Sequence, residues 1–175
     1  MNVDLLDRVR QTIARHPDRF CAAQWAFARN AEAVLRRGAS PEGFRCCIAG
    51  HVLLQRGVLT PRELLREGGF HTGGGVWTRA ARVASITEAQ GRELFFPSQW
   101  DRPYKQKYYL CARADEAELA ADYLDYYLEK YGKAPPERAS DAAASRARGG
   151  RPSPSRPPRT AQHEASPERR VGADR

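Results

Sequence analysis

Two cysteines and a histidine are the residues of this chain whose types and spacing could perform chemistry. Cys46, Cys47 and His51 lie in the segment C-C-I-A-G-H at positions 46–51. In a helix, Cys47 and His51 share one face because they are four residues apart, so both could bind one metal ion. The remaining ligands would come from distant positions, namely Cys21, His71 and Cys111. Zinc sites usually contain C-x₂₋₄-C pairs, and the sequence has none.

A nucleophilic thiol is the second chemistry that this segment could support. A reactive cysteine needs a lowered pKa, which a helix N-terminus or a neighbouring cation supplies. We expect Cys46 and Cys47 in the first turn of a helix, beside Arg45. The thiol also needs a base within hydrogen-bond distance, and the sequence alone places none of the three candidates there, which are His16, His51 and His71. We favour close helix packing, because Cys, Ala and Gly are small and free cysteine is commonly buried. We therefore predict no catalytic, cofactor-binding or metal-binding residue.

Aromatic and cationic side chains are interleaved over residues 95–109. The candidate contact residues are Trp100, Arg102, Tyr104, Lys105, Lys107 and Tyr108. Such side chains can stack on bases and bind phosphates, and they also dominate the energy of protein–protein contacts. In the competing interpretation, Trp100 and Tyr108 fill the core while the lysines are solvated. If the segment is a binding surface, we expect a protein partner ahead of a nucleic acid.

Two further patterns are weaker. The glycine run 73–75 lacks the G-K-[ST] ending and the preceding strand of a phosphate-binding loop, so we expect a flexible connector. Asp122, Asp125 and Glu129 lie along the last predicted helix. Carboxylate pairs perform acid–base chemistry when they are buried, and at this position a solvated acidic face is favoured.

Helical patterns must position all of these residues. Apolar residues recur at helical spacing over 3–15, and Pro17 ends this first helix. Capping boxes begin two more helices, at Thr60 and at Thr87. Other helices are expected over 22–37, 44–56, 77–85, 104–112 and 115–132. Because no segment alternates as a strand does, we predict an all-α, single-domain bundle of about seven or eight short helices over residues 1–133.

The order of these elements along the chain is similar to that of a known protein family. C-I-A-G at 47–50 is followed by the Thr87-capped helix with Leu94-Phe95, by Trp100, and by an amphipathic helix over 119–128. In this order the chain resembles a family of small, functionally uncharacterised bacterial and phage-borne helical proteins with the motif C-x-x-A-C-I-A-G-W. The resemblance covers roughly residues 3–130. This chain has His51 in place of that Trp, and Cys46 in place of a small residue such as Ala. The resemblance implies a helical fold, and it implies no functional residue because no activity is established for the family.

Composition changes near residue 133. The formal charge of the 175-residue chain is +8, and residues 134–175 hold 9 basic against 5 acidic residues. That segment has one large aliphatic residue, Val171, so it cannot bury enough apolar surface to offset chain entropy, and we predict a disordered Arg/Pro/Ser-rich tail. Its charge permits weak attraction to nucleic acid. However, only 4 of the 29 basic residues are Lys, a share of Arg that is typical of GC-rich coding.

The remaining features concern location and partners. The acidic start is unlike a secretory signal, and no run of about 18 apolar residues occurs, so we expect no membrane contact. Four cysteines without a disulfide pattern favour a reducing cytoplasm. The sequence thus predicts a cytoplasmic, non-enzymatic helical protein that binds another protein. One alternative is nucleic-acid association through the basic tail and the Lys105/Lys107 region. The other is a thiol- or metal-dependent enzyme centred on Cys46, Cys47 and His51.

Overall fold

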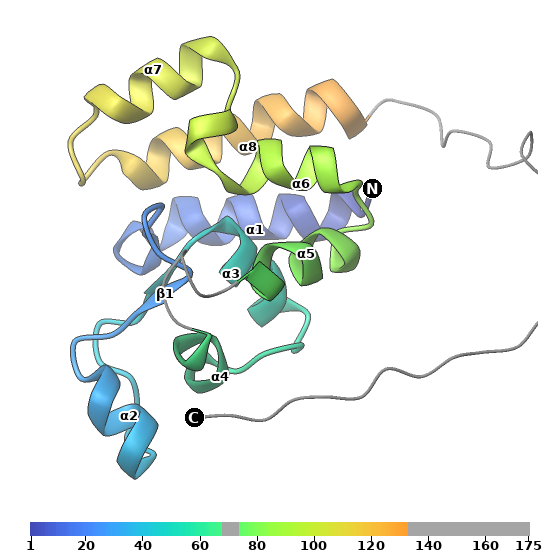
Figure 1. Cartoon of the computed structure of the whole chain (residues 1–175). Coiled ribbons are helices and arrows are strands. Elements are labelled where there is room, and N and C mark those ends of the chain that lie inside the picture. The colour runs from blue at the N-terminus through green and yellow to red at the C-terminus, as the bar shows by residue number, and fades with distance from the viewer. Residues whose placement is uncertain (68–73, 133–175) are drawn as a thin grey trace, which may run out of the picture. The chain divides into compact units, whose positions relative to one another are not determined.

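The computed structural model describes residues 1–67 and 74–132. Within these residues the chain forms eight α-helices and one short pair of strands (Figure 1). The predicted all-α fold is therefore confirmed. The predicted domain boundary at 133, the predicted tail and the glycine at 73 lie outside the described residues. Gly74 and Gly75, which we expected in a connector, begin a helix instead.

The first helix has the bounds that its apolar spacing predicts. α1 (Val3–Arg15) buries four of its five large aliphatic residues, Leu5, Leu6, Val9 and Ile13. The Asn2 side chain caps it by accepting a hydrogen bond from the backbone N–H of Leu5. α1 packs along α8 (Glu116–Gly132), and the two helices lie side by side through the middle of the fold (Figure 1).

The segment 22–37, predicted as one helix, contains two different elements. β1 (Ala26–Phe27) pairs antiparallel with β2 (Arg45–Cys46), and α2 (Ala31–Arg37) follows β1. Asn30 interrupts the helical pattern, because its side-chain amide donates to the carbonyl of Ser40 and accepts from the N–H of Glu42. The prediction of a continuous helix is therefore wrong. The end of the predicted range is correct, because α2 ends at Arg37 and Gly38 follows it in a left-handed conformation.

The helix predicted over 44–56 begins later than expected. Arg45 and Cys46 belong to β2, Cys47 precedes the first turn, and α3 spans Ile48–Gln55. The prediction is wrong at this end because backbone pairing with β1 satisfies the amide and carbonyl groups that a helix would otherwise use. α3 packs against α1, α5 (Gly74–Val83) and α6 (Glu88–Phe95), so it lies at the centre of the fold.

Both predicted capping boxes are present. Thr60 begins α4 (Pro61–Arg66) and pairs reciprocally with Glu63, and Thr87 begins α6 and pairs with Gln90 in the same way. These signals identify helix starts reliably because all of the groups involved lie within one turn.

A short connection leads from α6 to the outermost helix. A 3-10 turn (Pro97–Gln99) follows α6, and α7 (Arg102–Leu110) then lies along α8 on the outer side of the fold (Figure 1). No residue of α7 is fully buried. Among the described helices, none is long and apolar enough to cross a bilayer.

Candidate protein-interaction surface

Cys46 and Cys47 lie in the core. Cys46 is on β2. Cys47 occupies the N-cap position of α3, and its side chain makes no capping hydrogen bond. Burial raises the pKa of Cys47 to about 12 and raises that of Cys46 as well. Because the thiolate is the nucleophile and the metal ligand, neither cysteine is activated at neutral pH.

His51 is buried in the same region and is neutral at physiological pH. Its side chain is 5% exposed, and its ring stacks on Phe20 with centroids 6.3 Å apart. Burial lowers the pKa of His51 to about 4, and the charge of Arg19 acts in the same direction. Within residues 1–67 and 74–132, no three His, Cys, Asp or Glu side chains are arranged to hold a metal ion. His71, one of the predicted distant ligands, lies outside these residues, and within them Cys46, Cys47 and His51 belong to no metal-binding group.

Gly50 explains why small residues gather in this segment. A Cβ atom at this position would lie 2.7 Å from Cβ of Cys46, 2.9 Å from Cδ2 of Leu64 and 2.9 Å from the backbone oxygen of Trp25. The start of α3 therefore approaches three neighbouring segments more closely than any residue with a side chain would allow. This contact supports the packing interpretation of the C-C-I-A-G-H segment.

Trp100 is a core residue, as the competing interpretation of residues 95–109 expects, and it is not part of an exposed contact surface. It is 3% exposed, and its indole Nε1 donates a 3.1 Å hydrogen bond to the carbonyl of Leu94. Tyr108 is half-buried and packs edge-on against the indole, with ring centroids 5.8 Å apart. Trp100 is stable in the core because its ring buries a large apolar area while its N–H keeps a hydrogen-bond acceptor.

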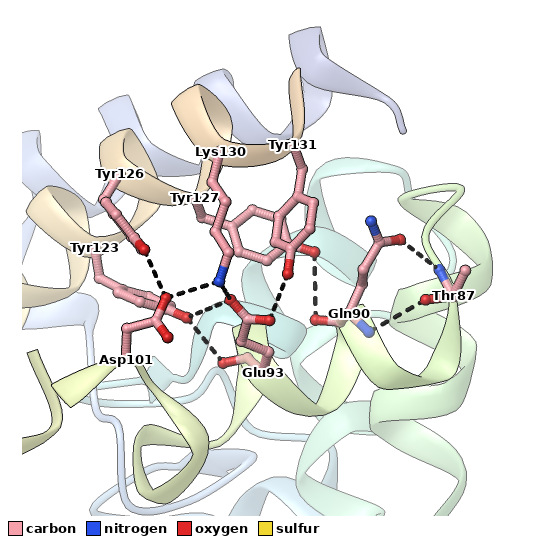
Figure 2. A network of polar contacts seen from close by, with 9 residues as sticks. All are labelled: Thr87, Gln90, Glu93, Asp101, Tyr123, Tyr126, Tyr127, Lys130 and Tyr131. Carbon is pink, nitrogen blue, oxygen red and sulfur yellow. Dashed lines mark hydrogen bonds and ion pairs between the residues drawn. The ribbon is translucent and has the colours of Figure 1, made fainter. Parts of the chain in front are cut away.

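A polar network on α8 fixes the start of α7. Lys130 Nζ lies 2.8 Å from Glu93 Oε1 and 2.8 Å from Asp101 Oδ2 (Figure 2). The hydroxyls of Tyr126 and Tyr131 donate to Asp101 and Glu93, each at 2.7 Å. Burial disfavours the charge of Lys130, but its hydrogen bonds to the two carboxylates outweigh this effect and raise its pKa. Asp101 directly precedes α7, so this network and the neighbouring Trp100 hold that end of the helix.

A groove separates the facing sides of α7 and α8, with a volume of about 650 Å³. From α7 it is lined by Pro103, Gln106, Lys107 and Leu110. From the start of α8 and the turn before it, the lining residues are Cys111, Asp115, Glu118, Leu119 and Asp122. The α7 set and the four residues from Asp115 onward each follow i, i+3, i+4, i+7 spacing, so each set forms one face of helical chain.

Apolar side chains are exposed beside this groove. Leu110 is 86% exposed and Tyr109 is 62% exposed, and they are the most exposed large apolar residues in the described part of the chain. We define the α7–α8 surface as the groove residues together with three exposed residues of α7, Arg102, Lys105 and Tyr109.

Charges of both signs flank the groove. Lys107 lines the groove from α7, and Arg102 and Lys105 are exposed on other faces of that helix. Asp115, Glu118 and Asp122 line the groove from the α8 side and are also exposed. Among the described residues, none of these six forms an ion pair. Lys107 Nζ instead lies over the ring of Tyr104, 5.8 Å from its centroid. The charged groups of this surface are therefore free to pair with another molecule.

The predicted contact residues divide into two groups. Arg102, Lys105 and Lys107 are exposed, whereas Tyr104 and Tyr108 lie on the inner face of α7 and are half-buried. Tyr104 packs against Tyr123 and Tyr126, with each pair of ring centroids 5.2 Å apart.

Two exposed apolar residues of this surface, Tyr109 and Leu110, are not among the predicted contact residues, and along the acidic side of the groove only Asp122 was predicted to lie on a solvated face. A helical projection of residues 102–110 contains a signal for the two apolar residues. With Tyr104 and Tyr108 on the inner face, the adjacent Tyr109 and Leu110 must point outward.

A comparison of the chain with models of protein families, with curated proteins and with solved structures finds no match. Its function is therefore inferred from its own residues.

Proposed function

We propose that this protein binds another polypeptide through the α7–α8 surface and is not an enzyme. The exposure of Leu110, next to Tyr109 and an open groove, is the observation that carries the proposal. Single exposed apolar residues are ordinary, but an apolar patch rimmed by charged side chains is typical of interaction sites. Leu119 and Pro103 extend the apolar surface into the groove.

The charges of this surface favour a protein over a nucleic acid. Lys105 and Lys107 could attract phosphates, but Asp115, Glu118 and Asp122 lie on the same surface and repel them. A groove with mixed charge and apolar walls is typical of protein contacts. The location we propose is the cytoplasm, and four free thiols support a reducing compartment.

Site-specific photo-crosslinking in cells that naturally produce the protein tests this function. A photoreactive phenylalanine analogue replaces Tyr109 in one variant and Val58, which is 40% exposed on a different segment, in a matched control. We expect a discrete crosslinked polypeptide from position 109, none from position 58, and loss of the product when Leu110→Arg is added. Equal products from both positions, or a product that nuclease removes, would contradict the proposal.

A further inference from the structure

The arrangement of charge on the α7–α8 surface constrains what can bind there. One helix exposes positive side chains, and the neighbouring helix exposes negative ones, with Leu110 and the groove between them. A surface shaped for an anionic or a cationic partner would carry mainly the opposite sign. This surface carries both signs on adjacent helices.

Two-fold association has a specific geometric requirement. In such a contact the same patch is used by both molecules, so each part of it must be complementary to another part of the same patch. A basic helix beside an acidic helix satisfies this requirement, because a rotation of 180° places each one against its opposite. Leu110 lies where apolar contact is needed, since it is in the groove and is the most exposed large apolar side chain in the described part of the chain.

We propose that the occupant of the α7–α8 surface is a second copy of this chain. This inference rests on the proposed function and names the partner. In the dimer, α7 of one protomer lies against the acidic side of its partner's groove, and the two Leu110 side chains meet near the two-fold axis. Lys107 of each protomer faces the partner's Glu118 and Asp122, and the exposed Arg102 and Lys105 add to the positive charge of α7.

The size of the surface sets the expected strength of the dimer. α7 has nine residues and is therefore about 13 Å long. A contact built on two such helices and the adjoining part of α8 is at the small end of specific interfaces, so monomer and dimer should exchange and their ratio should depend on concentration.

Sedimentation of the purified full-length protein, measured over a range of concentrations, is the decisive experiment. One variant carries Lys105→Glu with Lys107→Glu, and a second carries Glu118→Lys with Asp122→Lys. We expect the wild-type protein to approach twice the monomer mass at high concentration and each variant alone to remain a monomer. An equimolar mixture of the two variants should dimerise again, because every reversed charge then meets its complement. Leu110→Arg should be monomeric in every combination.

A matched control separates this result from a general effect of charge. Arg36→Glu with Arg37→Glu changes the net charge by the same amount on exposed positions of α2, and it should dimerise like the wild type. Circular dichroism of each variant shows that it is folded, and restored dimerisation in the mixture shows this independently.

The outcomes separate this inference from the proposed function. If the wild type is a monomer at every concentration while the probe at position 109 still captures a different polypeptide, the dimer is wrong and the proposed function stands. If the wild type is a monomer and no polypeptide is captured, both are wrong. A mixture of the two variants that stays monomeric while the wild type dimerises would show that the dimer uses another surface.

Discussion

The indole of Trp100 stacks on the phenol ring of Tyr123, with ring centroids 4.4 Å apart and ring planes at 20°. Tyr123 is fully buried in the middle of α8. Trp100 precedes α7 by two residues, so the stack attaches the start of α7 to the core. Near the far end of α7, which carries Leu110, the half-buried Tyr108 packs edge-on against the same indole.

Trp100→Ala should lower the free energy of unfolding by about 3–5 kcal/mol, because it removes a buried ring and leaves a cavity beside Tyr123. Tyr109→Ala, one of the exposed residues of α7, should change it by less than about 0.5 kcal/mol. Urea denaturation of both variants at low protein concentration provides the comparison. Similar losses for the two variants would mean that Trp100 is not a core residue.

Gly50→Ala should destabilise the protein by about 1–3 kcal/mol, since the new methyl group overlaps Cys46, Leu64 and the backbone of Trp25. In an open helical position the same substitution stabilises by about 0.5–1 kcal/mol. Gly75→Ala in α5 is such a control, because the nearest atom to its Cβ would be 3.9 Å away, on Arg79. In thermal denaturation, Gly50→Ala should therefore lower the melting temperature and Gly75→Ala should raise it. A higher melting temperature for Gly50→Ala would refute the close contact.

Lys130→Met should lower the stability by about 1 kcal/mol, because it breaks two ion pairs while keeping the aliphatic part of the side chain. The loss should be greatest at low salt, where charges are least screened. Lys105→Met is the matched control, since Lys105 is exposed and forms no ion pair within the described residues. If both variants lose the same stability at low and high salt, the network around Lys130 does not hold α7.

The stability should fall as the pH decreases from about 6.5 to about 4. The folded protein keeps His51 neutral with a pKa of about 4, whereas the ordinary value is 6.5. Between these values the unfolded chain binds more protons than the folded one, so acid favours unfolding by up to about 3 kcal/mol in total. Urea denaturation across this range should show that His51→Phe reduces the slope. His16→Gln, which changes an exposed histidine after α1, should leave the slope of stability against pH unchanged.

The four thiols should react with a disulfide reagent in two classes. Cys111 is half-exposed and should react first, while the three buried thiols, Cys21, Cys46 and Cys47, should react only as the protein unfolds. Cys111→Ser should therefore abolish the rapid phase under native conditions. A fast phase that Cys47→Ser removes would instead revive the thiol-enzyme hypothesis.

Local signals account for what the sequence predicted correctly. The bounds of α1 follow from Leu5, Leu6, Val9 and Ile13, and the capping boxes at Thr60 and Thr87 each lie within a single turn. The pairing of Ala26 with Cys46 joins residues that are distant in the chain, so local spacing does not predict it. Each strand is also only two residues long, which is too short to show an alternating pattern. The predicted helices over 22–37 and 44–56 were wrong for these reasons.

The candidate surface was only partly predictable. Lys105 and Lys107 are identified by their charge, but the burial of Trp100 depends on Leu94 and Tyr123, which local spacing does not reveal. The contacts of Lys130 with Asp101 and Glu93 span 29 and 37 residues. The groove exists only because α7 folds back along α8, and this arrangement is a property of tertiary structure.

The absence of fully buried residues in α7 has a consequence for the motions of the protein. An element that buries little apolar surface costs little free energy to release, so α7 should open as a local unit while the packing of α1 on α8 persists. Its backbone amides should then exchange with solvent deuterium faster than those of α8. Any molecule bound at Leu110 would have to suppress this opening, and slower exchange in α7 would report its binding without a label or a substitution.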